Sequence, residues 1–276
     1  MGKRNLYLKT TPVQEAVEIY RREVEKRVKL SYETIPVTEA LNRITGKAVY
    51  AKYCSPLFNA AAMDGIAEGA SENTPVELVI GKDCQVIDTG DPIHEPYDAV
   101  IMAEDLLETD DENKVRIIAS AVPWQHVRPV GEDIVAGEMI LPGRHCIRPI
   151  DVGVLLSGGI VEIEVVKNPE VAIFPTGTEI IEPGTEPKEG DMFENMAKVQ
   201  GAKAVRFKTI PDDYGKIRDA VKEAAEKFDM VIINAGSSAG TEDYTVHVLR
   251  ELGEVIIHGV SIKPGKPVIL AFVNDK

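Results

Sequence analysis

The chain has 276 residues, a hydrophobic content of 44% and a formal net charge of −14. This length predicts two domains, or three if one is small. The acidic surplus disfavours nucleic-acid binding, and no apolar stretch approaches the roughly 20 residues that span a bilayer. Since the N-terminus has no signal-peptide core, we expect a cytoplasmic protein without a nucleic-acid or membrane partner. Cys54, Cys84 and Cys146 lack metal-site spacing, which argues against a disulfide framework and a zinc site.

The first 48 residues show helical patterns. Residues 12–29 begin with a proline and carry an apolar stripe at helical spacing, formed by Val13, Ala16, Val17, Tyr20 and Val24. This pattern predicts an amphipathic helix. A second, short helix is expected over residues 37–44, where the pattern ends at Gly46.

From about residue 48 to 166, short apolar runs alternate with turn-forming residues, which is typical of a β-rich region. We expect strands at residues 76–80, 84–87, 99–102, 115–118 and 139–141. The turns at Asp64-Gly65, 88–92 and 131–134 each give only a turn signal on their own. The loop Trp124-Gln125-His126 either packs as a covered loop, which we favour, or stacks on a planar ligand.

After Asn168-Pro169 the pattern alternates between strands and helices, which indicates a parallel α/β domain. Strands are expected at residues 171–174, 203–210 and 230–233, and further apolar runs occupy 255–257 and 268–273. Helices are expected around 196–203, at 214–227 and at 244–252.

Two glycine-containing loops in this region are candidate anion sites. Residues 234–240 link an apolar run to a helix start, where backbone N–H groups and the helix dipole favour an anion. An ordinary joint capped by Ser238, Thr241 or Asp243 explains the turn equally well. Because Glu242 and Asp243 would repel a phosphate, a phosphate site here requires a divalent cation.

The second glycine loop, residues 263–267, puts two lysines on a stiff turn after another apolar run. If both runs are strands of one parallel sheet, the two loops lie at the same sheet edge, where ligand sites form in α/β proteins.

Six segments then occur in a recognisable order. They are AAAMDGIA, DTGDPI with DAVIMAED, VRPVGEDI, PTGTE, NAGSSAGTEDY and KPGKP. Together they resemble the molybdopterin molybdenumtransferases of the MoeA type, which also include the C-terminal part of gephyrin. The resemblance extends from about residue 5 to the end of the chain. Sequence variants around residues 60–66, 123–126 and 234–240 are similar to a prokaryotic branch in which a periplasmic-binding-protein-like domain follows.

The resemblance implies a fold and an activity. It implies an elongated, multi-domain homodimer with a helical/β domain (residues 1–48 and 138–168), an inserted β-rich domain (49–137) and a truncated α/β molybdopterin-binding domain (169–276). Members insert molybdate into adenylyl-molybdopterin with Mg²⁺ and release AMP, in a site between the α/β domain of one subunit and the inserted domain of the other. The alternative is a non-catalytic pterin- or nucleotide-binding module or scaffold, since the 276 residues lack the family's GLPGNP-type loop and C-terminal β-barrel.

The resemblance also implies site residues, position by position. The residues similar to catalytic acids are Asp64, Asp133, Glu179, Asp212 and Asp243, of which Glu179 and Asp243 are also assigned to the metal. The residues similar to cofactor-binding ones are Thr89, Gly236, Ser237, Ser238, Gly240, Lys263 and Lys266. The sequence departs from the family pattern at Ala235, Ile66 and Gly259, where a glycine, a tyrosine and a lysine are usual.

Overall fold

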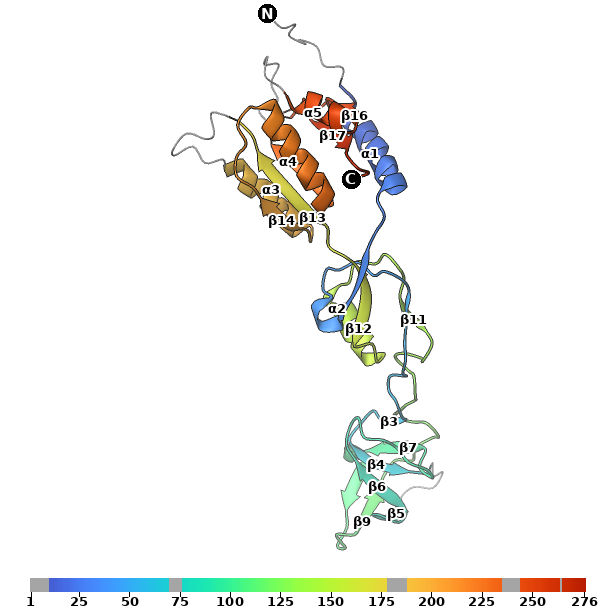
Figure 1. Cartoon of the computed structure of the whole chain (residues 1–276). Coiled ribbons are helices and arrows are strands. Elements are labelled where there is room, and N and C mark those ends of the chain that lie inside the picture. Colours follow the sequence, from blue (N-terminus) through green and yellow to red (C-terminus); the bar gives the residue numbers. More distant parts are fainter. Residues whose placement is uncertain (1–9, 70–75, 178–187, 235–243, 264) are drawn as a thin grey trace, which may run out of the picture. The chain divides into compact units, whose positions relative to one another are not determined.

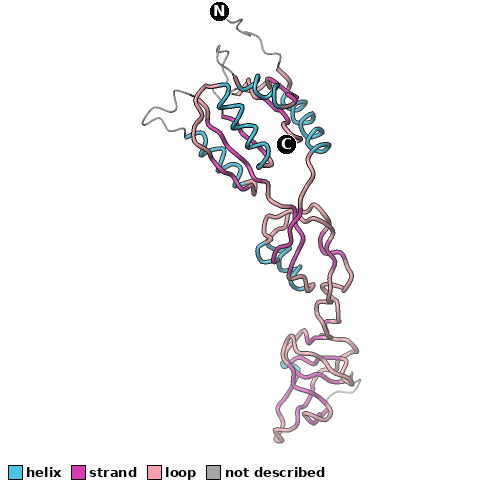
Figure 2. The backbone as a smooth tube through the Cα atoms, in the orientation of Figure 1, coloured by secondary structure: helices cyan, strands magenta, loops and turns pink. Residues whose placement is uncertain are grey.

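The computed structural model describes residues 10–69, 76–177, 188–234, 244–263 and 265–276, with only the backbone of 188–191. The chain forms two compact units, one of Tyr32–Val165 and one that joins Met1–Ser31 to Val166–Lys276 (Figure 1). Helices and strands alternate in the second unit, whereas residues 49–137 consist mainly of strands and loops (Figure 2). Among the described helices, none is long and apolar enough to cross a membrane.

The unit that contains the C-terminal residues is built on a three-stranded sheet of order β14-β13-β15. Its strands are β13 (Glu170–Pro175), β14 (Lys203–Arg206) and β15 (Met230–Asn234). Strand β13 pairs in parallel with both neighbours, which confirms the predicted parallel α/β arrangement. The accompanying helices are α3 (Lys188–Val199), α4 (Tyr214–Lys227) and α5 (Thr245–Leu252).

Helix α4 spans the residues that the sequence pattern predicted. Its start is fixed by Asp213, whose carboxylate accepts a hydrogen bond of 2.9 Å from the backbone N–H of Lys216. Its buried residues Ile217 and Val221 pack against Val248 of α5, so the two helices share one apolar core.

The last two strands, β16 (Glu254–His258) and β17 (Ile269–Phe272), pair antiparallel in a sheet of their own. The prediction that the loop at residues 263–267 lies at an edge of the parallel sheet is therefore wrong. A parallel crossover needs about a dozen residues or more, and residues 259–268 are too few to provide one. These residues form the loop of a β-hairpin instead.

Helix α1 (Val13–Arg27) confirms the predicted N-terminal helix, and it packs on this hairpin. Ala16 is buried against Ile257 and Val260, and the backbone N–H of Thr11 donates to the carbonyl of Gly259 at 3.0 Å. The helix therefore belongs to the unit of the C-terminal residues, whereas the sequence analysis grouped it with residues 138–168. The boundaries of the three expected domains otherwise stay a prediction.

The described residues of the unit Tyr32–Val165 form three groups of buried residues, the smallest of which consists of Ala61, Ala67, Ile87 and Val100. In the first, β1 (Tyr32–Pro36) pairs with β12 (Glu162–Val166), and β2 (Val49–Tyr50) pairs with β11 (Met139–Leu141). Helix α2 (Pro149–Ser157) covers them, with Leu155 fully buried.

The helix expected over residues 37–44 is reduced to the short 3₁₀ turn η1 (Val37–Glu39), so that prediction is wrong. The backbone N–H groups of Asn42 and Thr45 donate to the carbonyls of Ile147 and His145, both at 2.9 Å. Because these donors are used across the unit, they are not available to continue a helix.

The second group of buried residues lies between two three-stranded antiparallel sheets, β6-β4-β7 and β5-β9-β8. The strands at residues 76–80, 84–87, 99–102 and 115–118 are confirmed, as is the one at 139–141 above. The elements are β3 (Ala60–Ala61), β4 (Gly65–Glu68), β5 (Val76–Val79), β6 (Cys84–Ile87), β7 (Ala99–Met102), η2 (Ala103–Asp105), β8 (Leu106–Glu108), β9 (Lys114–Ile117) and β10 (Val127–Arg128). The central strand β4 was not predicted.

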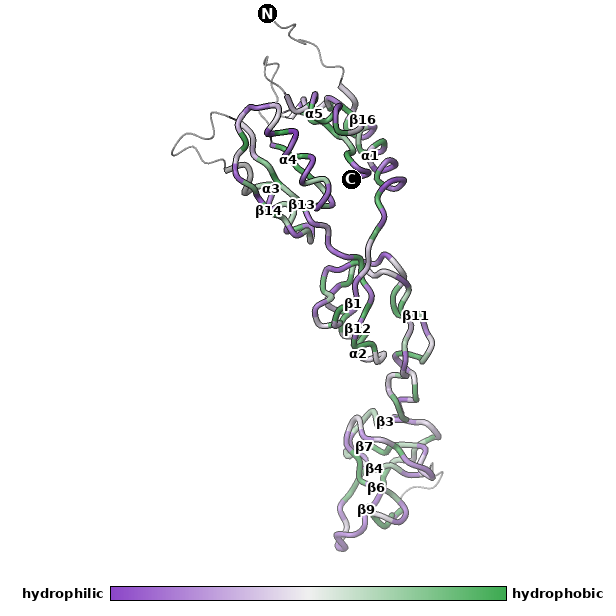
Figure 3. Tube along the Cα trace, in the orientation of Figure 1, coloured by the Kyte–Doolittle hydropathy of each residue, from purple (hydrophilic) through white to green (hydrophobic). Residues whose placement is uncertain are grey.

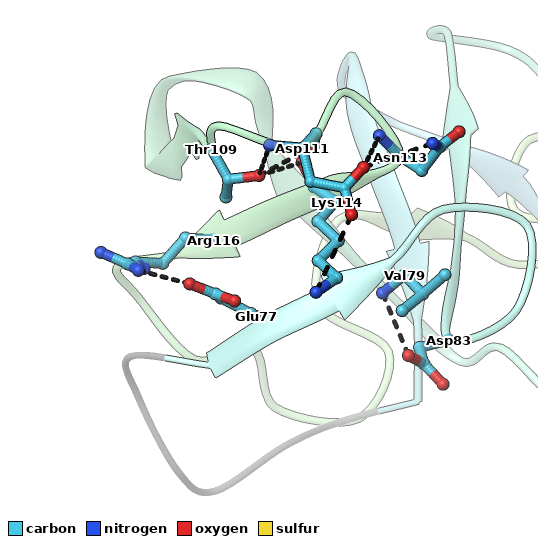
Figure 4. Close-up of polar contacts among 8 residues, drawn as sticks. All are labelled: Glu77, Val79, Asp83, Thr109, Asp111, Asn113, Lys114 and Arg116. Atoms are coloured by element: carbon cyan, nitrogen blue, oxygen red, sulfur yellow. Dashed lines mark hydrogen bonds and ion pairs between the residues drawn. The ribbon is translucent and has the colours of Figure 1, made fainter.

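Polar side-chain contacts stabilise the turns next to the sheet β5-β9-β8 (Figure 4). Asp111 accepts a hydrogen bond of 3.1 Å from the backbone N–H of Asn113, and Asp83 accepts one of 3.0 Å from Val79. Arg116 forms an ion pair with Glu77 on the paired strand. None of the residues in these contacts is a predicted site residue, so this network is structural.

Candidate functional site

Three of the predicted motifs meet on strand β3 in the unit Tyr32–Val165. The backbone N–H of Ala61 donates to the carbonyl of Asp91 at 2.9 Å, and the N–H of Gly90 donates back to Ala61 at 2.8 Å. The N–H of Ala62 donates to the carbonyl of His126 at 2.8 Å. The turn at residues 88–92 and the loop at 124–128 are therefore both bound to the segment that leads into Asp64.

Asp64 is held by Thr89. Its Oδ1 accepts hydrogen bonds from the hydroxyl and from the backbone N–H of Thr89, each of 2.7 Å. These two bonds lower the pKa of the Asp64 carboxyl, the hydroxyl contributing most, so an exposed carboxylate stays ionised in a fixed position. Oδ2 accepts no hydrogen bond from any residue that the structure describes, so it remains available to a ligand.

Gly65, the first residue of β4, allows the backbone to pass very close to strand β7. It has a φ of +155°, and a Cβ at this position would lie 1.9 Å from the carbonyl oxygen of Ile101. Only glycine fits this close approach. A glycine is thus needed to start β4 immediately after Asp64.

Asp133 has a structural partner. Arg128 donates to the carboxylates of Glu132 and Asp133, with nitrogen–oxygen distances of 2.7 Å to each. The charge of Asp133 is therefore already paired, and the arginine connects strand β10 to the turn that follows it. Its catalytic role stays a prediction.

The loop at residues 124–126 has an unusual backbone. Trp124 and His126 adopt φ angles of +69° and +56°, which are uncommon for residues other than glycine. The Trp124 side chain is 55% exposed, so the favoured prediction of a covered loop is wrong for this residue. The alternative, stacking on a planar ligand, stays a prediction.

In the second unit, the carboxyl ends of the parallel strands meet at one edge. The N–H of Thr176, which follows β13, donates to the carbonyl of Asn234 at the end of β15 at 2.8 Å. The N–H of Gly177 donates to Ile210 at 3.1 Å, two residues before Asp212. Ligand sites of open α/β sheets form at such an edge. Six predicted site residues that follow it lie outside the described residues: Glu179, Gly236, Ser237, Ser238, Gly240 and Asp243.

Lys263 and Lys266 lie in the hairpin loop between β16 and β17, and both are exposed. The loop is closed by a 2.9 Å hydrogen bond from the N–H of Val260 to the carbonyl of Lys266. Gly265 turns the chain with a φ of +100°. Neither lysine forms an ion pair with a residue in the described part of the chain, so both cations are available to an anion.

The described residues include no group of three or more His, Cys, Asp or Glu side chains placed to hold a metal ion. Glu179 and Asp243, the two residues assigned to Mg²⁺, are outside the described ranges. The metal assignment therefore stays a prediction.

A buried carboxylate at the start of helix α2 was not predicted from the sequence. Asp151 accepts hydrogen bonds from the backbone N–H, Nε and Nη2 of Arg148 at 2.9, 3.0 and 2.8 Å, and its Oδ2 lies 2.7 Å from Nε2 of His145. These contacts, those with the Arg148 side chain first, hold the pKa of Asp151 well below its usual range despite burial. The signal in the sequence is an acid two residues after Arg148-Pro149, in the first turn of a helix.

Comparisons with known proteins assign a class to this combination of units. Residues 11–159 match the family described as "MoeA N-terminal region (domain I and II)", and residues 172–276 match a "probable molybdopterin binding domain". The chain is 34% identical over 270 residues to a putative molybdopterin biosynthesis protein of Methanocaldococcus jannaschii, covering 88% of this chain and 67% of the relative.

Two further relatives agree. A molybdopterin molybdenumtransferase of Staphylococcus aureus is 29% identical over 294 residues, with 96% of this chain and 69% of the relative covered. The crystal structure of a molybdopterin biosynthesis MoeA protein from Pyrococcus horikoshii superposes with a TM-score of 0.78 at 28% identity, covering 97% of this chain and 73% of that one. The chain belongs to the MoeA family.

Proposed function

We propose that the protein acts in molybdenum cofactor biosynthesis and inserts molybdate into adenylyl-molybdopterin with release of AMP. The observation that carries this proposal is the match of both parts of the chain to MoeA-type domains, one of them a molybdopterin-binding type. The naming of the Staphylococcus aureus relative as a molybdenumtransferase supports the same reaction.

The chemistry of the described residues fits this substrate class. Molybdate and a pyrophosphate-linked pterin are anions, and the exposed cations Lys263 and Lys266 suit them. The free Oδ2 of Asp64 suits a hydrogen-bond donor, such as an N–H of the pterin ring. We assign Thr89 the task of orienting Asp64, and we retain Asp133 and Asp212 as proposed catalytic acids.

The remaining assignments rest on the family resemblance. Gly236, Ser237, Ser238 and Gly240 are proposed to bind the cofactor through backbone N–H groups and hydroxyls. Glu179 and Asp243 are proposed to hold Mg²⁺, which would offset the repulsion between carboxylates and an anionic ligand.

We further propose an elongated cytoplasmic homodimer whose active site takes residues from the inserted domain of one subunit and the α/β domain of the other. A two-fold dimer would supply both halves of such a site twice. The predicted acids are spread over residues 64–243, which agrees with a site assembled from both units.

The test is AMP release from adenylyl-molybdopterin after molybdate is added to the purified protein. The wild type should release AMP, and Asp64→Asn should slow the release at least about tenfold, since an oriented charged acceptor is lost. Asp243→Asn should abolish it if this acid holds the metal. Asp110→Asn is the control, because Asp110 is an exposed acid of the same unit outside all six motifs.

The outcomes separate the two candidate functions. Tight binding of adenylyl-molybdopterin by the wild type, without AMP release, would favour the non-catalytic pterin-binding module. Equal AMP release by wild type and Asp64→Asn would remove Asp64 from the reaction. Absence of binding and of release would refute both functions.

A further inference from the structure

The loop that precedes strand β10 places polar side-chain groups next to a hydrophobic strand. All residues of strand β7 are hydrophobic (Figure 3), whereas the loop consists of Trp124, Gln125 and His126, which each carry a polar side-chain group. The N–H of Trp124 donates to the carbonyl of Asp98 at 2.8 Å, and the carbonyl of Gln125 accepts from the N–H of Val100 at 3.0 Å. The side chains of the loop therefore project from a backbone that is held in place.

The same loop is bound to the segment that leads into Asp64. The carbonyl of His126 accepts a hydrogen bond of 2.8 Å from the N–H of Ala62. Asp64 follows Ala62 by two positions, which span at most about 7 Å. Thr89 donates to Oδ1 of Asp64, and Oδ2 accepts no hydrogen bond from a described residue. His126 is therefore a near neighbour of the open acceptor on Asp64.

The hydrogen bonds of Gln125 determine which ring nitrogen of His126 carries the proton. Oε1 of Gln125 accepts a hydrogen bond of 3.0 Å from the backbone N–H of Val122, which fixes the orientation of the side-chain amide. Nε2 of this amide lies 3.3 Å from Nε2 of His126. Because an amide NH₂ group only donates, the imidazole Nε2 must be the acceptor. The neutral imidazole therefore carries its proton on Nδ1.

The Nδ1–H group of His126 is available to a ligand. It donates to no residue in the described part of the chain, and it is not buried. The residue as a whole is half-buried, and its φ of +56° is uncommon for a residue other than glycine. Sparsely populated backbone conformations of this kind cluster at active sites and ligand clamps. The loop thus presents one oriented donor near the oriented acceptor of Asp64.

We propose that His126 and Asp64 together bind the pterin ring of the substrate by its lactam edge, with Gln125 as the positioning residue for His126. In this edge a ring N–H lies next to a carbonyl group. Oδ2 of Asp64 accepts from the ring N–H, and Nδ1–H of His126 donates to the carbonyl oxygen. The inference rests on the proposed function, and it names the part of the substrate that this unit contacts.

The charges of this region favour an uncharged ring over the anionic groups of the substrate. Arg128, the cation that follows the loop, is already paired with Glu132 and Asp133. Asp64 would repel a phosphate or molybdate, whereas it attracts a ring N–H. Adenine, the other ring of the substrate, also offers a donor beside an acceptor, but it has no carbonyl oxygen. The pterin is therefore the better match, and AMP serves as the competing ligand in the test.

Titration of the full chain with 6-hydroxymethylpterin, which carries neither phosphate nor molybdate, tests the contact. The only tryptophan, Trp124, lies two residues from His126, so its fluorescence reports binding. His126→Asp should bind the pterin at least about tenfold more weakly than His126→Asn, because Asn keeps an N–H donor and Asp, of the same size, does not. Both residues tolerate a left-handed backbone. His94→Asp is the control, since it makes the same exchange at an exposed histidine of the same unit, and it should bind the pterin as the wild type does.

Nitrogen-15 NMR of the imidazole ring tests the positioning role of Gln125. In the wild type, Nδ1 of His126 should carry the proton and Nε2 should not. Gln125→Glu keeps the acceptor for Val122 but replaces the amide donor by a carboxylate oxygen, so Nε2 of His126 should become protonated. A role of Gln125 in packing alone would not move this proton. The resonances of His126 are assigned by their absence from His126→Asn.

Each outcome bears on a defined claim. Equal pterin affinities of His126→Asp and His126→Asn, or no pterin binding by the wild type, would overturn the proposed contact and leave the proposed function standing. A proton on Nε2 in the wild type would overturn the role of Gln125 and the donor at Nδ1. If binding of AMP rather than of the pterin depends on His126, the assignment to the pterin ring is wrong. A wild type that binds the pterin as described but releases no AMP from adenylyl-molybdopterin would refute only the proposed function.

Discussion

The buried carboxylate of Asp151 gives a stability prediction that follows from its contacts. Replacing Asp151 with Asn removes a charge that is 5% exposed and accepts three hydrogen bonds from Arg148. Breaking a buried ion pair costs about 3–5 kcal/mol, and this range must be reduced because the Arg148 side chain is 64% exposed to water. We therefore expect a loss of about 2–3 kcal/mol at pH 7.

The pH dependence of this loss has a definite sign. The pKa of Asp151 is lower in the folded state than its value of about 3.9 in an unfolded chain. Its contribution to stability is therefore fully present above about pH 4, and is lost as the pH falls through the folded-state pKa. The difference between wild type and Asp151→Asn should shrink correspondingly below about pH 4.

Urea unfolding followed by tryptophan fluorescence measures this effect, since the only tryptophan, Trp124, lies in the same unit as Asp151. Asp110→Asn is the control, because Asp110 is an exposed acid of the same unit, so the same tryptophan reports on it. Its stability should change by no more than about 0.5 kcal/mol. Equal midpoints for wild type and Asp151→Asn at pH 7 would refute the reasoning.

Three further predictions concern the candidate site and the core beside it. Thr89→Val removes the hydroxyl donor, so the pKa of Asp64 should rise towards its ordinary value in an NMR titration; an unchanged pKa would contradict the assigned contact. Replacing both Lys263 and Lys266 with Met should weaken binding of adenylyl-molybdopterin at least about tenfold at an unchanged melting temperature, because charge-assisted hydrogen bonds are lost from exposed residues. Burial raises the pKa of Glu68, and its Oε1 accepts no hydrogen bond from the described part of the chain. Glu68→Gln should therefore melt at a higher temperature than wild type at pH 7 but not below about pH 4, and equal melting at pH 7 would contradict this.

The sequence predicted the elements whose periodicity extends over many residues. Helix α4 has the predicted bounds, and α1 differs from its prediction by a few residues, because a long apolar stripe determines both a helix and its buried side. Short elements were less well predicted. The pattern at residues 37–44 is helical, but hydrogen bonds to residues 145–147 override it, and a contact across a hundred residues leaves no local signal.

The direction in which neighbouring strands pair was the second feature that the sequence pattern did not predict. The apolar run at residues 255–257 forms a strand as predicted, yet periodicity does not distinguish a parallel partner from an antiparallel one. The length of the loop before β17 carries that information, since it excludes a crossover helix. The position of Lys263 and Lys266 in a hairpin follows from loop length rather than from the glycine motif.

For the site, the motif residues were found in the sequence but their contacts were not. Asp64 and Thr89 are separated by 25 positions, and the pairing of β4 with β6, together with the hydrogen bonds of Ala61 to Asp91 and Gly90, brings them together. Asp133 was grouped with Asp64 because both are motif acids, whereas the structure gives it Arg128 as a partner. Trp124 is exposed and has a left-handed backbone conformation, and its local sequence predicts neither feature.

The contrast between Asp64 and Asp133 also indicates how each acid contributes. Asp64 receives both of its hydrogen bonds on one oxygen and from neutral donors, so it keeps a full negative charge and an open acceptor. Asp133 shares the cation of Arg128 with Glu132, so a ligand would have to displace an ion pair to reach it. A ligand that contacts Asp64 therefore meets a preorganised acceptor without such a displacement. Of these two motif acids, Asp64 is accordingly the one whose carboxylate is more accessible to a ligand.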